Sequence, residues 1–291
     1  GFKNYVIAIN VTKGATNYPN MIKWSALTTF GAIPADWDET LETSHANEMP
    51  ISTLRGKAID GGGLGNTFIV YSSDSVHALD YIGAPYIFGD RTLFTDGGIL
   101  GTNCWVEVNG VHYVFGDRDI YRHNGITKES IISSRNKKFI FDQLNKSLTH
   151  VSFVSHVEAD SEIHFHFNSV ASDIKWPGVD FCNLAAVYNY EDDTWSFNDV
   201  PNVNSMTTAG LTSGLLWSEL TDSWADQGGT WASMSTGTAL LDVYSSANNY
   251  LLAWDAVDEG SRVPKPLVTA YLTTPWVLRE GIDLDEEGFP V

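Results

Sequence analysis

Short apolar runs that alternate with polar residues recur in pairs along this chain, and a tight polar turn separates the two runs of each pair. The plainest example is AVYNYEDDTWSFNDVP, in which an alternating strand passes through an Asp-rich turn to Thr194 and Trp195 at the start of a second strand. Self-similar units at a period of about 40 to 50 residues are typical of β-propellers and related arrays. Hairpins of this plan, with centres roughly 40 to 75 residues apart, lie at Phe68–Tyr81, His112–His123, Ala186–Pro201 and Leu240–Trp254.

The pattern predicts an all-β protein: a β-propeller-like array of small antiparallel sheets with inserted loops, truncated at both ends. The 291 residues, 43% of them hydrophobic, suffice for one large β domain or two ordinary domains. A Ser-, Thr- and Gly-rich stretch, with three Trp residues spaced seven apart, interrupts the strand pattern. We therefore expect four segments: a first propeller-like part at 1–204, the Trp-rich insertion at 205–237, continued propeller strands at 238–276, and an acidic connection to a following domain at 277–291.

Two shorter stretches carry local predictions. The glycine-rich run Gly61–Asn66 predicts a turn before the strand that begins at Thr67, because glycine gives the backbone freedom to reverse. Thr127–Lys146 is the one stretch whose apolar spacing suits a helix. Apolar runs stay well below the length of about 18 residues that a membrane-spanning helix needs, so we expect no membrane insertion by this chain.

Charge is the strongest bulk property. The chain has 36 acidic and 17 basic residues, a formal net charge of −19. This balance speaks against binding nucleic acid by phosphate neutralisation, which requires clustered Lys and Arg. The stretch Arg122–Lys146 is the basic exception, and it is interpreted either as a solvated face or as a contact with an acidic neighbouring subunit.

Metal and disulfide chemistry has little support in the sequence. Cys104 and Cys182 have no CxxC spacing, so buried free thiols are expected. In EIHFHFN the alternation places His164 and His166 on one face of a strand, which is half of a conceivable metal site. Without a third ligand, exposed or hydrogen-bonded histidines are the preferred interpretation, and neither a metal nor a cofactor is predicted.

Catalytic motifs are also missing from the sequence, which contains no GxSxG, HExxH, Walker or EF-hand pattern. Neighbouring acids such as Asp117 with Asp119, or Asp192 with Asp193, are of the kind that glycosidases use in pairs. Acids in hairpin turns more often hydrogen bond to their own backbone, so turn chemistry is favoured. We expect no catalytic residue; the alternatives are a glycan-binding or glycan-hydrolysing β-propeller and, less favoured, a secreted kelch-like interaction module.

A family resemblance covers nearly the whole chain. It is carried by the order of YPNMIKWSAL, GAIPADWDET, GNTFIVYSSDSVHALDYIG, GVHYVFGDRDIYRHNG, CNLAAVYNYEDDTWSFNDVP and the serial Trp segment, followed by REGIDLDEEG. In this order the chain resembles the tail nozzle proteins of short-tailed bacteriophages, also called tail tubular protein B. The resemblance implies a structural virion protein, built on a β-propeller with added domains, that is made in the host cytoplasm and resides in the phage tail.

The resemblance also implies partners. Such proteins form a six-fold ring below the portal and adaptor, contact adaptor subunits and tail fibres, and let the genome pass without binding it. They are usually much longer, so we expect the domain that forms the distal tip to be missing. We predict subunit contacts at Trp217, Trp224, Trp231, Arg122, Arg135, Lys137 and Lys138, and an acidic channel lining at Asp255, Asp258, Glu259, Asp283 and Asp285.

Overall fold

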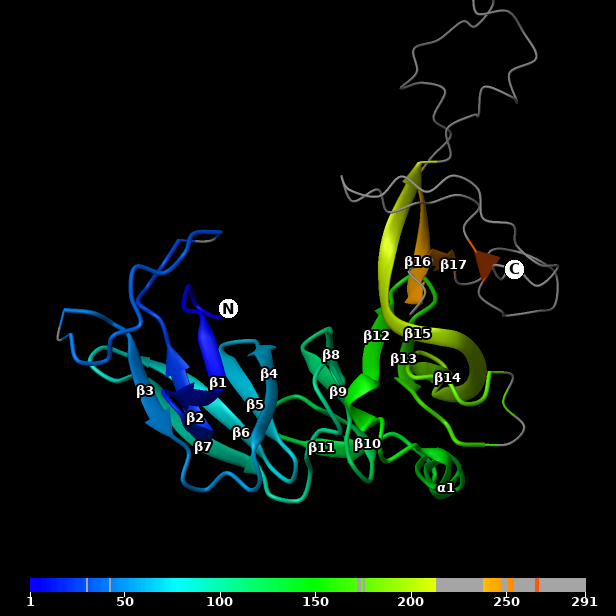
Figure 1. Ribbon diagram of the computed structural model, residues 1–291, viewed down its shortest axis with the longest axis horizontal. Coiled ribbons are helices and arrows are strands. Elements are labelled where there is room, and N and C mark those ends of the chain that lie inside the picture. Colours follow the sequence, from blue (N-terminus) through cyan, green and yellow to red (C-terminus); the bar gives the residue numbers. More distant parts are fainter. Residues whose placement is uncertain are drawn as a thin grey trace, which may run out of the picture. The chain divides into compact units, whose positions relative to one another are not determined.

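The computed structural model describes residues 1–29, 31–41, 43–171, 174, 176–212, 238–246, 251–253 and 265–266 (Figure 1). The protein is all-β and consists of several small antiparallel sheets, as the sequence predicts. Two compact units make up the chain: unit 1 holds Gly1–His156 and Phe165–Ala171, and unit 2 holds Val157–His164 and Ser172–Val291. Among the residues described, no helix has the length and apolar character needed to cross a membrane.

The first sheet of unit 1 has the order β1-β2-β3, with β1 at Ile7–Lys13, β2 at Thr16–Trp24 and β3 at Asn47–Pro50. A two-residue turn joins β1 to β2, since Lys13 pairs with Thr16. Gly14 has a φ of 59° in this turn, a backbone conformation that glycine adopts without strain. The sheet is therefore an antiparallel meander that begins with a tight hairpin.

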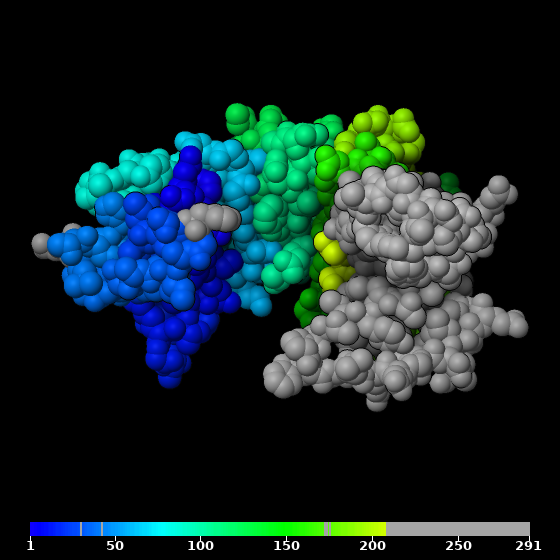
Figure 2. Space-filling model, turned by 90° about the horizontal axis from the view of Figure 1, so that it is seen from above, coloured from blue at the N-terminus to red at the C-terminus, as the bar shows by residue number. Residues whose placement is uncertain are grey.

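Two four-stranded meanders follow in unit 1, and in each one the strands lie in chain order. One contains β4 (Ala58–Leu64), β5 (Thr67–Ser72), β6 (Val76–Gly83) and β7 (Ile87–Phe94). The next contains β8 (Trp105–Val108), β9 (Val111–Phe115), β10 (Ile120–His123) and β11 (Lys128–Ser130). The three sheets follow one another from blue to green in Figure 1, and Figure 2 shows the same order of colours on the surface of this part of the chain.

Strand β4 contains most of the glycine run for which a turn was predicted, so that prediction is wrong for Gly61–Gly63. The reason is close packing. A Cβ atom on Gly62 would lie 1.9 Å from the ring of Trp105 on β8, and one on Gly61 would lie 2.5 Å from the Ile69 carbonyl oxygen. The glycines therefore let β5 and the next sheet approach β4, and only Gly65 and Asn66 remain for the turn.

An apolar core joins the first sheet to the β4–β7 sheet. Phe88 lies at its centre and makes edge-to-face contacts with Tyr5 at 5.5 Å and with Trp24 at 5.2 Å between ring centroids. Phe2 and Phe68 continue the cluster, with their ring centroids 5.8 Å apart. Burial of each such side chain contributes about 1.5–3 kcal/mol, so aromatic packing helps to hold these two sheets together.

Helix α1 (Ser134–Gln143) lies inside the stretch for which a helix was predicted. The Ser133 side chain caps its first turn by accepting a hydrogen bond from the Asn136 amide at 3.3 Å. That turn contains no acidic residue and instead carries Arg135 and Lys137. Cations near the positive end of a helix dipole cost about 0.3–1 kcal/mol each, so these residues do not stabilise the helix.

The remaining sheet has seven strands, ordered β12 to β18 along the chain. A short 3₁₀ helix, η1 (Thr149–Val151), precedes its first strand. The long strand β15 runs through residue 204, at which the first propeller-like segment was predicted to end. The strands are β12 (Phe153–Val157), β13 (Glu162–Phe167), β14 (Cys182–Asn189), β15 (Thr194–Thr212), β16 (Thr238–Ser246), β17 (Leu251–Ala253) and β18 (Lys265–Pro266).

The hairpin between β14 and β15 is the one in which the repeated sequence pattern is clearest. The Asn189 side-chain oxygen accepts hydrogen bonds from the amides of Glu191 and Asp192, both at 3.0 Å. Asp193 accepts a hydrogen bond from the Tyr188 hydroxyl at 2.9 Å, and Tyr188 also contacts the Trp195 ring. The Asp193 side chain thus accepts a hydrogen bond within the hairpin, and Asp192 donates its backbone amide to the turn.

Candidate functional site

Two adjoining hollows in unit 1 form the candidate site. The smaller one, of about 430 Å³, is lined by three turns at Ser73–Asp74, Thr95–Gly98 and Gly116–Asp119. These turns pack so closely that a Cβ atom on Gly98 would lie only 1.9 Å from the Ser73 carbonyl oxygen, which leaves room for glycine alone. We call this hollow the turn cleft.

The larger hollow, of about 880 Å³, extends from Asp117 and Arg118 to α1 and the segment after it. Its lining holds five cationic residues, which are Lys57, Arg118, Lys137, Lys138 and Lys146, against two acidic residues, Asp74 and Asp117. Apolar side chains line it as well, namely Ile59, Ile99, Leu100, Phe141 and Leu144. We call it the cationic hollow.

Its cations differ in whether they have an acidic partner. Arg118 lies 3.3 Å from Asp117, and Lys137 lies 3.1 Å from Asp119. Lys57, Lys138 and Lys146 are exposed, and none of them has a carboxylate within 4.0 Å among the residues that the structure describes. The hollow therefore keeps an uncompensated positive charge on a chain whose net charge is −19.

The structure places only part of the predicted contact residues at this site. Lys137 and Lys138 line the cationic hollow, while Arg135 lies on α1 outside its lining. Arg122 lies on β10, opposite Glu129 on β11, and donates two hydrogen bonds to that carboxylate at 3.0 and 2.8 Å. The other predicted contact and channel residues, Trp217, Trp224, Trp231, Asp255, Asp258, Glu259, Asp283 and Asp285, lie outside the described residues.

A buried network that sequence reasoning missed connects the two four-stranded sheets. The Tyr71 hydroxyl lies 2.7 Å from His112 Nδ1 and 2.6 Å from His123 Nε2. His112 and His123 face each other across the β9–β10 pair, and Trp105 stacks on His112 at 4.5 Å. The hairpin HYVFGDRDIYRH could have revealed this pairing, since its two terminal histidines are at cross-strand partner positions.

The backbone fixes the direction of every proton in this network. The Gly125 amide donates to His123 Nδ1 at 3.2 Å, which makes His123 Nε2 a donor to the Tyr71 oxygen. Tyr71 then donates to His112 Nδ1, and His112 Nε2 donates to the Gly63 carbonyl at 2.9 Å. Burial lowers the pKa of His123 to about 3 and also lowers the pKa of His112, so both rings are neutral at neutral pH.

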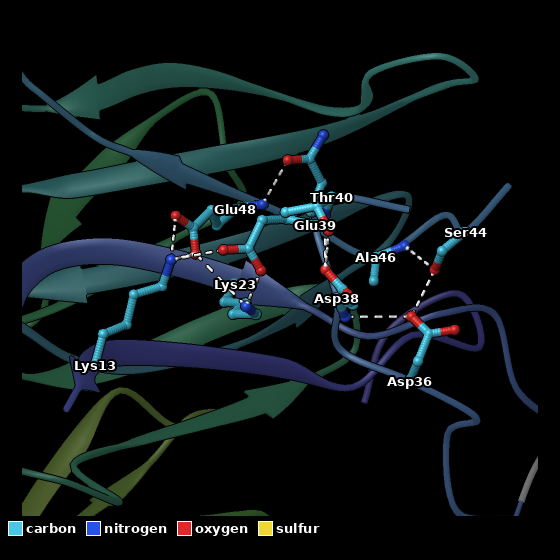
Figure 3. A network of polar contacts seen from close by, with 10 residues as sticks. Lys13, Lys23, Asp36, Asp38, Glu39, Thr40, Ser44, Ala46 and Glu48 are labelled. Atoms are coloured by element: carbon cyan, nitrogen blue, oxygen red, sulfur yellow. Dashed lines mark hydrogen bonds and ion pairs between the residues drawn. The ribbon is translucent and has the colours of Figure 1, made fainter. Parts of the chain in front are cut away.

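A second polar network joins the strands of the first sheet (Figure 3). Lys13 on β1 contacts Glu39 at 2.8 Å and Glu48 on β3 at 2.5 Å, and Lys23 on β2 also contacts Glu39. Hydrogen bonds from Lys13 and then Lys23 lower the pKa of Glu39 to about 2. This network ties the loop between β2 and β3 to the sheet, a structural role.

The histidines of β13 are buried rather than exposed. His166 stacks on Phe153 at 4.2 Å and lies 3.2 Å from the Ser155 hydroxyl, and His164 lies 3.0 Å from Glu162. Among the described residues, no group of three or more His, Cys, Asp or Glu side chains is placed to hold a metal ion. Cys104 and Cys182 are buried free thiols, as predicted, and burial raises the pKa of Cys104 to about 12.

The acids of the turn cleft are engaged in local contacts. Asp119 accepts a hydrogen bond from Ser130 at 2.8 Å besides its contact with Lys137, and Asp96 lies 3.1 Å from Lys128. A glycosidase general acid needs a carboxyl group in an apolar surrounding that keeps it protonated. Asp96 and Asp119 have charged and hydrogen-bonded surroundings instead.

Comparison with models of known protein families finds no match for this chain, and comparison with curated proteins finds no significant similarity either.

Proposed function

We propose that this chain is a structural subunit of a bacteriophage tail and forms part of the nozzle conduit through which the genome is ejected. The observation that carries the proposal is the packing of two consecutive four-stranded meanders in unit 1, β4–β7 and β8–β11, through Gly62, Trp105 and Tyr71. β-Propellers are built from four-stranded sheets packed side by side, so this packing supports a propeller-like arrangement. The family that the sequence resembles is built on such a domain.

The net charge of −19 supports the same role. A conduit must pass DNA without retaining it, and carboxylates repel phosphates over a distance of about 10 Å at 0.1 M salt. In the proposed assembly six copies form a ring that contacts the tail adaptor and the tail fibres. Asp255, Asp258, Glu259, Asp283 and Asp285 are the proposed lumen residues, and Trp217, Trp224 and Trp231 the proposed contacts between subunits.

The test is to locate the protein in particles and to measure its assembly. Tagged protein should appear on the tail axis in electron micrographs of intact particles, and the purified chain should form rings alone or with its adaptor, as read by mass photometry. Trp224→Ala should lower the ring fraction. A chain that is absent from particles, or that stays monomeric with the adaptor, contradicts the proposal.

A glycan-binding or glycan-hydrolysing propeller is the second candidate, because the turn cleft brings Arg55, Arg118 and Tyr121 together with four aspartates. Arginines and an aromatic ring beside carboxylates are groups that also recognise sugars. The same purified chain should be incubated with model glycosides and with immobilised glycans. Turnover or binding that Asp117→Asn abolishes would favour this candidate over the structural role.

A further inference from the structure

The cationic hollow has properties of a docking site for an acidic chain segment. Three of its lysines, Lys57, Lys138 and Lys146, have no acidic partner among the described residues, and they come from three separate segments of unit 1. A further cation of the lining, Lys137, lies at the end of α1 where the helix dipole disfavours it. The positive charge of the three lysines is thus not compensated by ion pairs within the described part of the subunit.

The apolar part of the lining distinguishes a polypeptide from a nucleic acid. Ile99 and Leu144 are buried, and Ile59, Leu100 and Phe141 are partly buried, while the lysines beside them are exposed. A phosphate backbone would use the cations alone, whereas a peptide with apolar side chains between its carboxylates uses both kinds of lining. The strongly acidic remainder of the chain also repels a polyanion as large as DNA.

The chain itself contains a segment of this composition. Residues 279–291, REGIDLDEEGFPV, carry five carboxylates against one arginine, and Ile282, Leu284 and Phe289 lie among them. We propose that the cationic hollow binds this acidic segment of a second copy of the chain. Carboxylates pair with the free lysines, and apolar side chains of the segment contact Phe141 and its apolar neighbours.

Such a contact is heterologous, because the hollow of one copy meets a different surface of the next copy. Heterologous contacts generate rings when the rotation between copies closes. The ring rests on the function proposed above, but binding of the segment does not, since it is measured on the purified chain alone. This contact replaces the lumen role proposed above for Asp283 and Asp285, and it leaves Asp255, Asp258 and Glu259 as the proposed lumen residues.

The first experiment measures binding of a fluorescent peptide of residues 279–291 to the full chain by anisotropy. Replacement of Lys57, Lys138 and Lys146 by Gln should weaken binding about tenfold, because three ion pairs, each weak at an exposed surface, are lost together. Arg135→Gln is the matched control on the same helix and should change binding less than about twofold. A peptide with Gln and Asn in place of its acids, or with Ser in place of Ile282, Leu284 and Phe289, should bind more weakly than the natural one.

The second experiment exchanges charges between copies. One chain carries Lys57→Glu, Lys138→Glu and Lys146→Glu, and another carries Lys at its five acidic positions from 280 to 287. Each variant alone should self-associate less than the natural chain in sedimentation velocity, and an equal mixture should associate again. Association that is unchanged in the variants, a mixture that stays monomeric, or duplex DNA that displaces the peptide at equal charge would overturn the proposal.

Discussion

At Tyr71 one hydroxyl group joins two sheets of unit 1, since it accepts a hydrogen bond from His123 and donates one to His112. All three side chains are essentially buried, with exposures of 0 or 1%. Each hydrogen bond in the chain from the Gly125 amide to the Gly63 carbonyl has only one consistent direction. Removal of this one hydroxyl group therefore affects the hydrogen bonding of both histidines.

Tyr71→Phe removes that hydroxyl and leaves His112 Nδ1 and His123 Nε2 without their partner. An unsatisfied buried polar group costs about 1–3 kcal/mol, so we expect the variant to lose about 2–4 kcal/mol of unfolding free energy. Urea unfolding followed by tryptophan fluorescence measures the loss. Tyr86→Phe is the control: Tyr86 is 71% exposed, and its variant should change by less than about 0.5 kcal/mol. Equal stability of the two variants would show that the network contributes nothing.

At the scale of the element, β4 shows where sequence patterns mislead. The strand Ala58–Leu64 reads AIDGGGL, which is turn-like composition, yet it pairs with β5 at Ala58 and from Asp60 to Leu64. Local propensity cannot show that Trp105, more than 40 positions further on, needs the space above Gly62. The strand that begins at Thr67 and the hairpin within His112–His123 were predicted at their observed positions.

Gly62→Ala tests that explanation. The new methyl group would lie 1.9 Å from Trp105, so the ring or the strand must move, and overpacking of this kind costs about 1–3 kcal/mol. Gly63→Ala, at the adjacent position, meets nothing closer than Phe2 at 3.4 Å and should be nearly neutral. Thermal unfolding compares the two. Trp105→Phe in the Gly62→Ala background should recover part of the loss, and additive effects would exclude a contact between these two positions.

Across the whole molecule, the sequence predicted the class of fold and the basic stretch on α1, but not the site as a whole. The cationic hollow needs Lys57 and Arg118 beside Lys137 and Lys138, and no spacing rule links positions 57 and 138. Prediction of the histidine network likewise requires the register between β9 and β10, which the sequence of the hairpin gives only once the position of its turn is known. Long-range register and close packing are therefore what the pattern could not supply.

The dependence of stability on pH should separate the two polar networks of unit 1. Unfolded histidine titrates near pH 6.5, whereas folding lowers the pKa of His123 to about 3 and also lowers that of His112. As the pH falls below about 6.5, the unfolded chain binds protons that the folded chain does not. Stability should therefore decrease toward lower pH, by at most about 1.4 kcal/mol per pH unit for each histidine.

The effect of Glu39 on stability falls in a lower pH range, because its pKa of about 2 lies below the usual value of 4.5. Its contribution is complete above pH 4.5 and is lost only as the pH falls toward 2. Urea unfolding at pH 7.5, 6.5 and 5.5 should show a smaller loss of stability for His123→Gln than for the natural chain, while Glu39→Gln keeps the natural slope in this range. If His123→Gln and the natural chain lose stability equally between pH 6.5 and 5.5, protonation of the buried network does not control the acid response.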